Sequence, residues 1–425
     1  MKKRFDKLST KQIALILTSL TITLLLILEF LVRGTFYLYD KEWGYANEDI
    51  RYLPYVTYFN SPLRKKNTLS KNSTQFTKNK HSVILATDRY GFSLDSNDDP
   101  NRDLSRKTQC QYRVFMLGGS TAEGRFLSSE DDTLAARLEI LLGKQHPKID
   151  FQVINAGEGS FYSVQEVALH FFYIEYFSKP DHIIYFDGSN DFTLWPRNEL
   201  PGVGGNMHPY ANQLFRRAKS INTMGGAINL LFQRLSNWSA VIYGLHKSIN
   251  YPPKLRVFLG VKNNEKTSSE EWVDRHLDRY FYNMKLALKS ADKNTLVSYV
   301  FQPTLLPETP ASREELILMK DYFRPNSFHG YNYFNNKQKF YERARFIFRN
   351  LGMTNKNPYS TVYDLSFLFS SKSKDETVFG DHVHYLSNAR KIISQAIFDA
   401  IKPKVLEQLS SPQFVSCSKS FVKHN

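Results

Sequence analysis

The sequence predicts an α/β protein with a doubly wound, largely parallel sheet, preceded by a helix that spans a membrane. Two observations lead to this. Short apolar runs alternate with helical patterns from residue 112 onward. A separate stretch near the N-terminus, residues 13–32, is apolar over twenty positions. With 425 residues, 42% of them hydrophobic, the chain can build one large α/β domain with additions, or two smaller domains.

The N-terminal apolar stretch reads IALILTSLTITLLLILEFLV, with Glu29 as its only charge. Twenty helical residues span about 30 Å, the thickness of a bilayer core. Residues 1–12 carry five Lys or Arg against the single acid Asp6, so we expect this end to stay cytoplasmic. The rest of the chain would then lie in the periplasm or outside the cell. A cleaved signal peptide is the alternative, although no small-x-small cleavage site follows.

The flanking segments are predicted to be peripheral. Residues 33–110 are polar and turn-rich, and we expect a linker or a small N-terminal module there. Residues 403–425 form a C-terminal tail. The chain has two cysteines, Cys110 and Cys417, which are too few for a disulfide scaffold or a cysteine metal site. They could pair in an oxidising compartment.

The α/β pattern predicts a domain over residues 111–402. Its apolar runs indicate buried parallel strands, and the patterns between them indicate helices. The predicted strands are 112–117, 151–155, 182–187, 296–301 and 361–365, and the clearest helices are 134–142, 164–177 and 269–289. Ligands of such sheets bind at the carboxyl ends of the strands.

A basic insertion interrupts the alternation at residues 200–264. It contains eight Lys or Arg and no Asp or Glu, and parts of it look helical and amphipathic. It is either an extra helical layer with a solvated basic face or a surface for anionic lipid headgroups or an anionic polymer. No nucleic-acid-binding motif accompanies the net charge of +15.

Four short polar motifs follow the predicted strands or precede the last helix. GGSTAEG surrounds Ser120, INAGEGSFYS follows the second strand, FDGSNDF contains Asn190, and GDHVHYL contains Asp381 and His384. The first motif could cradle a phosphate, but no Lys follows its second glycine and the P-loop spacing is absent. A nucleophilic serine on a tight strand-to-helix turn is the other interpretation.

These motifs, in this order, resemble the SGNH (GDSL-like) hydrolase superfamily over residues 112–400, in the form of a membrane-anchored bacterial member. The resemblance implies a three-layer α/β/α sandwich of the flavodoxin-like type with a five-stranded parallel sheet, and esterase or related acyl-transfer chemistry. The chain departs from the family where Gly-Asp-Ser becomes Gly118-Gly119-Ser120. Gly124 stands where the later glycine of the family motif belongs.

Residue types at the matched positions fit this chemistry. Ser120 would be the nucleophile and His384 the base that takes its proton, because imidazole titrates near neutral pH. Asp381 would hold the histidine ring in the required tautomer and stabilise the imidazolium. Asp381, His382 and His384 could also resemble a metal site, but no further ligand cluster is evident. We therefore expect neither a metal nor a cofactor.

The expected oxyanion hole combines the backbone N–H of Ser120, the side chain of Asn190 and a donor from the second motif. Aligning that motif on its asparagine places Ser160 where the family usually has a glycine. A serine also has the backbone N–H that the role needs. Gly157 and Gly159 are the neighbouring alternatives.

The leading functional hypothesis is a membrane-anchored serine esterase or deacylase that acts on acyl esters, such as O-acetyl groups, of an envelope glycan or lipid. An O-acyltransferase that uses the same triad to modify a glycan is the second hypothesis. A non-catalytic envelope binding or scaffold protein is the third, and the joint presence of Ser120, Asn190, Asp381 and His384 argues against it. The sequence leaves the acyl group, its carrier and the oligomeric state open.

Overall fold

A computed structural model describes residues 9–40, 50–51, 59–60, 62–63, 65, 67–69, 82–159, 161–193, 270–322 and 333–419. The basic insertion at 200–264 and the predicted oxyanion residue Ser160 lie outside these ranges.

The chain divides into two compact units. The first comprises Met1–Glu48 and Pro209–Asn264, and its described part is helix α2 (Thr10–Asp40). Within the described residues, no helix is both long and apolar enough to cross a membrane. The spanning segment expected at 13–32 therefore stays a prediction.

The second unit, Asp49–His208 with Glu265–Asn425, is built on the expected parallel sheet. All five apolar runs form strands, and nearly all their side chains are buried in the first four strands. The strands are β5 (Gln111–Gly118), β6 (Asp150–Gly157), β7 (His182–Asp187), β8 (Leu296–Phe301) and β9 (Ser360–Asp364). Their order in the sheet is β6-β5-β7-β8-β9, and each neighbouring pair is parallel.

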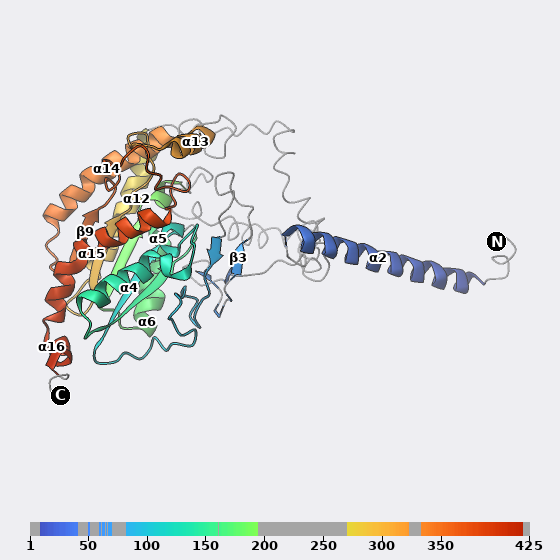
Figure 1. The fold of residues 1–425 in the computed structure, drawn as a ribbon, viewed down its shortest axis with the longest axis horizontal. Helices are drawn as coiled ribbons and strands as arrows, with labels where there is room; N and C mark the ends of the chain where they lie inside the picture. Colours follow the sequence, from blue (N-terminus) through green and yellow to red (C-terminus); the bar gives the residue numbers. More distant parts are fainter. Residues whose placement is uncertain are drawn as a thin grey trace. The chain divides into compact units, whose positions relative to one another are not determined.

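Helices cover this sheet in two groups. The larger ones are α4 (Leu134–Gln145), α5 (Ser163–Leu169), α12 (Glu270–Lys289), α14 (Tyr333–Thr354) and α15 (Ser387–Leu409). The connection from β5 through α4 to β6 moves toward one edge of the sheet. The connections through α5, α12 and α14 move toward the other edge. Because such crossovers are right-handed, α4 lies on the other face from these three. Helix α15 packs beside α4, and α12 contacts both α5 and α14 (Figure 1).

The order reverses at β5, because β6 lies on one side of it and β7 on the other. The carboxyl ends of strands beside such a reversal form a crevice that binds ligands in open α/β sheets. Ser120 follows β5 and Asn190 follows β7, so both lie at this position.

The remaining elements are short. They are β1 (Ile50–Arg51), β2 (Phe59–Asn60), β3 (Asn67–Leu69), β4 (Ser82–Ile84), α3 (Ser120–Glu123), η1 (Glu130–Asp132), η2 (His170–Ile174), α6 (Glu175–Phe177), α7 (Ser189–Thr193), α13 (Arg313–Tyr322) and α16 (Pro412–Lys419). The helix expected over 164–177 is divided into α5, the π-helical turn η2 and α6.

The segment before β5 packs onto the sheet in its described part. Phe92, Leu94 and Leu104 are buried, and the backbone N–H of Ser93 donates to the carbonyl of Asn155 on β6 (3.1 Å). Residues 82–110 thus contribute to the same core as the five strands.

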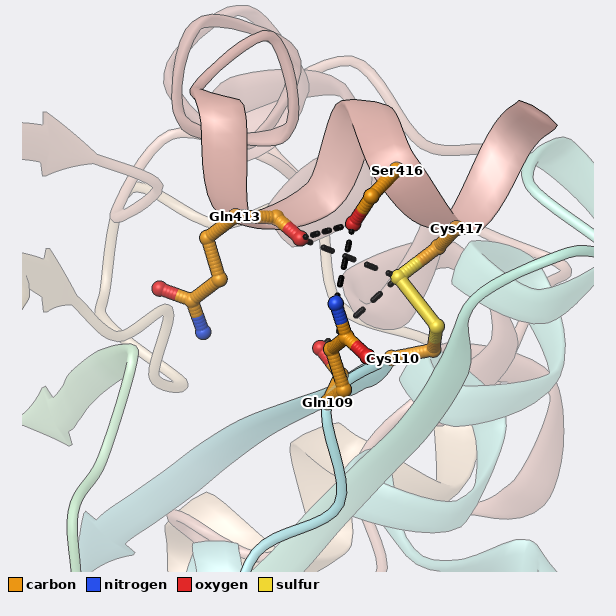
Figure 2. Close-up of a disulfide and its surroundings, with 5 residues drawn as sticks. All are labelled: Gln109, Cys110, Gln413, Ser416 and Cys417. Atoms are coloured by element: carbon orange, nitrogen blue, oxygen red, sulfur yellow. Dashed lines mark hydrogen bonds between the residues drawn. A yellow bond between two sulfur atoms is a disulfide. The ribbon is translucent and has the colours of Figure 1, made fainter. Parts of the chain in front are cut away.

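A disulfide joins Cys110, just before β5, to Cys417 on α16, across 307 residues of sequence (Figure 2). The Cα atoms are 5.6 Å apart, within the usual range for a disulfide. The rings of Tyr112 and Phe414 pack at 5.6 Å beside this link. The disulfide therefore links helix α16 to the start of β5. The sequence left open whether the two cysteines pair, and in the structure they do.

Candidate active site

Ser120 begins the short helix α3 immediately after β5, and it is partly exposed. The preceding Gly119 has no room for a side chain: a Cβ there would lie 2.1 Å from Nδ2 of Asn190. Glycine at this position therefore lets the Asn190 amide lie against the backbone next to the Ser120 hydroxyl.

A continuous hydrogen-bonded chain runs from Ser120 to Asp381. The Ser120 Oγ lies 2.6 Å from Nε2 of His384, and Nδ1 of His384 lies 2.7 Å from Oδ2 of Asp381. Since an ionised carboxylate only accepts hydrogen bonds, Nδ1 carries the proton that it shares with Asp381. The other ring nitrogen, Nε2, is then the acceptor for the serine hydroxyl, which is the tautomer needed to take its proton.

The carboxylate of Asp381 is held by its own loop. Its Oδ1 accepts the backbone N–H groups of Val383 (2.9 Å) and His384 (2.8 Å). Burial alone would raise the pKa of Asp381, but the charge and hydrogen bonds of His384 and the neighbouring His382 lower this pKa well below its ordinary value. Asp381 therefore stays ionised and can stabilise a proton gained by His384.

Asn190 lies at the start of α7, where its side chain is oriented by one hydrogen bond. Its Nδ2 donates to the carbonyl of Phe161 (2.6 Å). An amide nitrogen carries two hydrogens, and among the described residues the second has no partner. With Nδ2 beside Gly119, this hydrogen can be donated to an oxygen bound near Ser120. The N–H of Ser120 stands at the first position of α3, where the helix itself offers no acceptor.

Within the described residues, the INAGEGSFYS motif supports the site by close packing and provides no identified donor to the oxyanion. The N–H of Gly157 is already donated to Oδ1 of Asn155 (3.1 Å), so this residue does not serve the oxyanion role in this structure. A Cβ on Gly157 would come within 2.3 Å of the backbone nitrogen of Glu123, and this glycine lets β6 approach α3 closely. Whether Ser160 donates stays a prediction, because it lies outside the described residues.

Phe126 is a site neighbour that the motifs do not indicate. Its ring meets the imidazole of His384 edge-on, with centroids 5.7 Å apart. Its φ of 61° is unusual for a bulky residue. Buried Arg390 donates to the backbone carbonyls of Arg125 and Phe126 and pairs with Asp132, which holds this turn against the site. A positive φ in a non-glycine residue leaves no signal in the sequence.

Three buried carboxyl groups lie behind Asn190. Asp191 accepts two hydrogen bonds from Ser163, and Asp187 accepts one from Tyr299. Among the described residues, neither oxygen of Glu166 has a hydrogen-bond partner. Burial, and then the mutual repulsion of the three groups, raises the pKa of Glu166 well above its ordinary value. Ionising these carboxyl groups therefore costs free energy close to the turn that carries Asn190.

Within the described part of the chain, no group of three or more His, Cys, Asp or Glu side chains is arranged to hold a metal ion. The described site instead provides a hydroxyl, a base with an oriented partner and a side-chain N–H donor. Together these can activate an oxygen nucleophile and stabilise negative charge that forms on a carbonyl oxygen.

No model of a known protein family matches this sequence, and no curated protein matches it. The chain is similar to several solved structures. A variant of the acetyl xylan esterase Axe2 from Geobacillus stearothermophilus is 12% identical with a TM-score of 0.34, covering 69% of this chain and 97% of that one. The lipase Lip_vut3 from a goat rumen metagenome is 14% identical with a TM-score of 0.36, covering 68% and 97%.

A third structure is LAE5, an alpha/beta hydrolase enzyme from the metagenome of Lake Arreo, at 11% identity and a TM-score of 0.34, covering 68% and 94%. A likeness of this size does not establish a shared activity. The function must therefore follow from the geometry of the site itself.

Proposed function

We propose that this protein is a serine esterase of the SGNH type, in which Ser120, His384 and Asp381 form the catalytic triad. The observation that carries the proposal is the chain of hydrogen bonds from the Ser120 Oγ through both nitrogens of His384 to Asp381, at 2.6 and 2.7 Å. The position of Ser120 at the carboxyl end of β5, beside the reversal of strand order, supports it.

The first half-reaction transfers the acyl group to the enzyme. The Ser120 Oγ attacks the ester carbonyl carbon while its proton passes to Nε2 of His384, and the carbonyl oxygen becomes an oxyanion. Asn190 and the N–H of Ser120 donate hydrogen bonds to that oxygen. The bond between the carbonyl carbon and the alcohol oxygen then breaks, and the leaving alcohol takes the proton from His384.

The second half-reaction releases the acyl group. His384 removes a proton from water, the resulting hydroxide attacks the acyl-enzyme, and the bond to the Ser120 Oγ breaks as Oγ regains its proton. A carboxylic acid leaves. If a glycan hydroxyl replaced water in this step, the same triad would perform O-acyl transfer, so the identity of the second product separates the two activities.

The direct test is to incubate the protein with short-chain nitrophenyl esters and acetylated glycans. We expect free acid to form, a fluorophosphonate probe to label Ser120, and both results to be lost in Ser120→Ala and His384→Ala with folding retained. The double variant should be scarcely less active than either single one, because the two residues act as one unit. Turnover or labelling that survives Ser120→Ala would refute the assignment, whereas acyl groups appearing on the glycan would identify a transferase.

We further propose that the site works outside the cytoplasm, on acyl esters of an envelope glycan or lipid, with residues 13–32 as an uncleaved anchor. The apolar run and the basic residues before it support this arrangement. The Cys110–Cys417 disulfide is a second support, because such bonds persist in oxidising compartments. A reporter that works only after export, fused after Asn425, should be active. Activity of a cytoplasm-only reporter at the same position would refute the topology.

A further inference from the structure

One buried cation lies behind the loop that carries Asp381 and His384. Lys337 on α14 is 0% exposed, although its ammonium group is strongly hydrated in water and expensive to bury. A methionine of similar length would occupy the same space without this cost. The polar contacts of Lys337 therefore need an explanation.

The contacts that Lys337 makes in the described part of the chain centre on one carbonyl group. The backbone oxygen of His382 accepts from Nζ of Lys337 (3.2 Å), from the hydroxyl of Thr304 (3.0 Å) and from the N–H of Leu305 (3.3 Å). Nζ of Lys337 also donates to Oγ1 of Thr304 at 2.5 Å. Three donors from α14 and from the segment after β8 thus fix the carbonyl of His382, one of the two residues between Asp381 and His384.

We propose that Lys337 is a positioning residue of the triad, which holds the Asp381–His384 loop through the His382 carbonyl and places a positive charge behind Asp381. This rests on the proposed esterase function. Lys337 touches neither Ser120 nor the acyl group in this scheme. It fixes the distance from the loop that carries Asp381 and His384 to Ser120. A 1 Å error in such a distance can lower the rate by about 10²-fold.

The charge of Lys337 couples to the triad. Burial lowers the pKa of Lys337 to about 7, against the opposing effect of Asp381. Among the described residues, the loop that Lys337 contacts carries the titratable groups Asp381, His382 and His384, and Tyr341 lies one turn further along α14. Below neutral pH the protonated amine opposes a further positive charge on the triad. Removing it should make uptake of a proton by the triad easier.

The experiment compares Lys337→Met, which removes both donor and charge, with Lys337→Gln, which keeps an N–H donor without the charge. In the full-length protein we expect Lys337→Met to lower kcat by up to about 10²-fold with little change in KM. Lys337→Gln should recover part of kcat. In both variants the acid limb of the kcat/KM profile should move to higher pH.

Arg345→Met is the matched control, because Arg345 is a buried cation on the same helix. Its partners are Ser366 and Glu308, outside the loop that carries Asp381 and His384. It should lower the melting temperature without moving the pH profile. Thr304→Val is a milder probe if Lys337→Met fails to fold. It removes the hydroxyl that bonds both Lys337 and the His382 carbonyl, and it should lower kcat in the same direction.

A readout without substrate separates this proposal from the esterase assignment. The proton shared by Nδ1 of His384 and Asp381 should give a far-downfield proton resonance, and this signal should shift or broaden in the Lys337 variants but not in Arg345→Met. An unchanged resonance, or a kcat loss equalled by Arg345→Met, would overturn the positioning role. If the wild-type protein neither hydrolyses esters nor reacts with the probe, the esterase assignment fails while the resonance still tests the role of Lys337.

Discussion

The Asn190 amide carries the sharpest prediction for a single side chain. It is fixed by the carbonyl of Phe161 and lies against Gly119, so it is oriented before any substrate binds. Asn190→Ala should lower kcat by about 10²–10³-fold with a small effect on KM, because the oxyanion exists only after attack on the carbonyl. Steady-state kinetics on a nitrophenyl ester measure this.

Asn355→Ala provides the control for that variant. Asn355 also donates to a backbone carbonyl, that of Ser360 (3.0 Å). Ser360 begins β9, so this bond lies at the amino ends of the strands, whereas the site lies at their carboxyl ends. Its loss should reduce stability and leave kcat unchanged. Equal kinetic effects in the two variants would mean that Asn190 acts only through the fold.

Sequence motifs predict those site residues that a short, continuous segment of chain is enough to position. Ser120 lies on a strand-to-helix turn, and Asp381 and His384 are three residues apart in one loop, so a short pattern identifies each. Lys337 and Phe126 could not be found this way. Each reaches the site through a tertiary contact with a distant segment. The sequence around Lys337 carries no pattern typical of an active site, and Phe126, although it closely follows the GGSTAEG motif, is not a position that the motif specifies.

Helix α5 combines support for the site with a buried carboxyl group whose ionisation is unfavourable. Glu166 is fully buried, and its oxygens have no hydrogen-bond partner within the part of the chain that the structure describes. Burial, and then the charges of Asp187 and Asp191, raise its pKa. A carboxyl group with a raised folded-state pKa contributes stability below its unfolded pKa of about 4.3, and that contribution is lost as pH rises through the folded value. Glu166→Gln removes the titration while keeping the shape.

We therefore expect Glu166→Gln to melt at nearly the wild-type temperature near pH 4 and at a higher temperature at mildly alkaline pH. Thermal unfolding across this range measures the difference. Glu314→Gln on α13 is the control, because Glu314 is exposed and should show no such gain. A variant that is less stable than wild type at alkaline pH would show that ionised Glu166 has a favourable partner.

Among the helices, prediction was least accurate next to this cluster. The apolar periodicity over 164–177 indicated one helix, but the chain widens into the π-helical turn η2 at His170–Ile174. Within that turn the His170 ring is hydrogen-bonded to Tyr185 on β7 and to Glu175. Tyr185 belongs to the sheet, so an α-helical period could not reveal this contact of His170.

Alternation of strands and helices along the chain was enough to predict the parallel sheet, because buried strands have continuous apolar runs. The pairing of Cys110 with Cys417 was open for a different reason. The two residues are 307 positions apart, and only the docking of α16 beside β5 brings their Cα atoms to 5.6 Å. No periodic pattern records a contact of that range.

Closing so long a segment should make the disulfide a major contributor to stability. In the chain-entropy account a crosslink restricts the unfolded chain more as the closed loop grows, and loss of a native disulfide commonly costs about 2–5 kcal/mol. Reduction, or Cys417→Ser, should therefore lower the melting temperature of the sheet-containing unit. Since Tyr112 and Phe414 still pack together, α16 should stay docked below that temperature and ester turnover should persist.

The double variant Cys110→Ser/Cys417→Ser separates the crosslink from side effects of the reductant. It should melt at the temperature of the reduced wild type and should not respond to reductant, because no bond remains to break. Differential scanning calorimetry with and without reductant provides both values. Wild-type protein whose melting temperature is indifferent to reductant, although free thiols are then detected, would show that packing of α16 alone holds the end of the chain. The long loop would in that case contribute little to the free energy of unfolding.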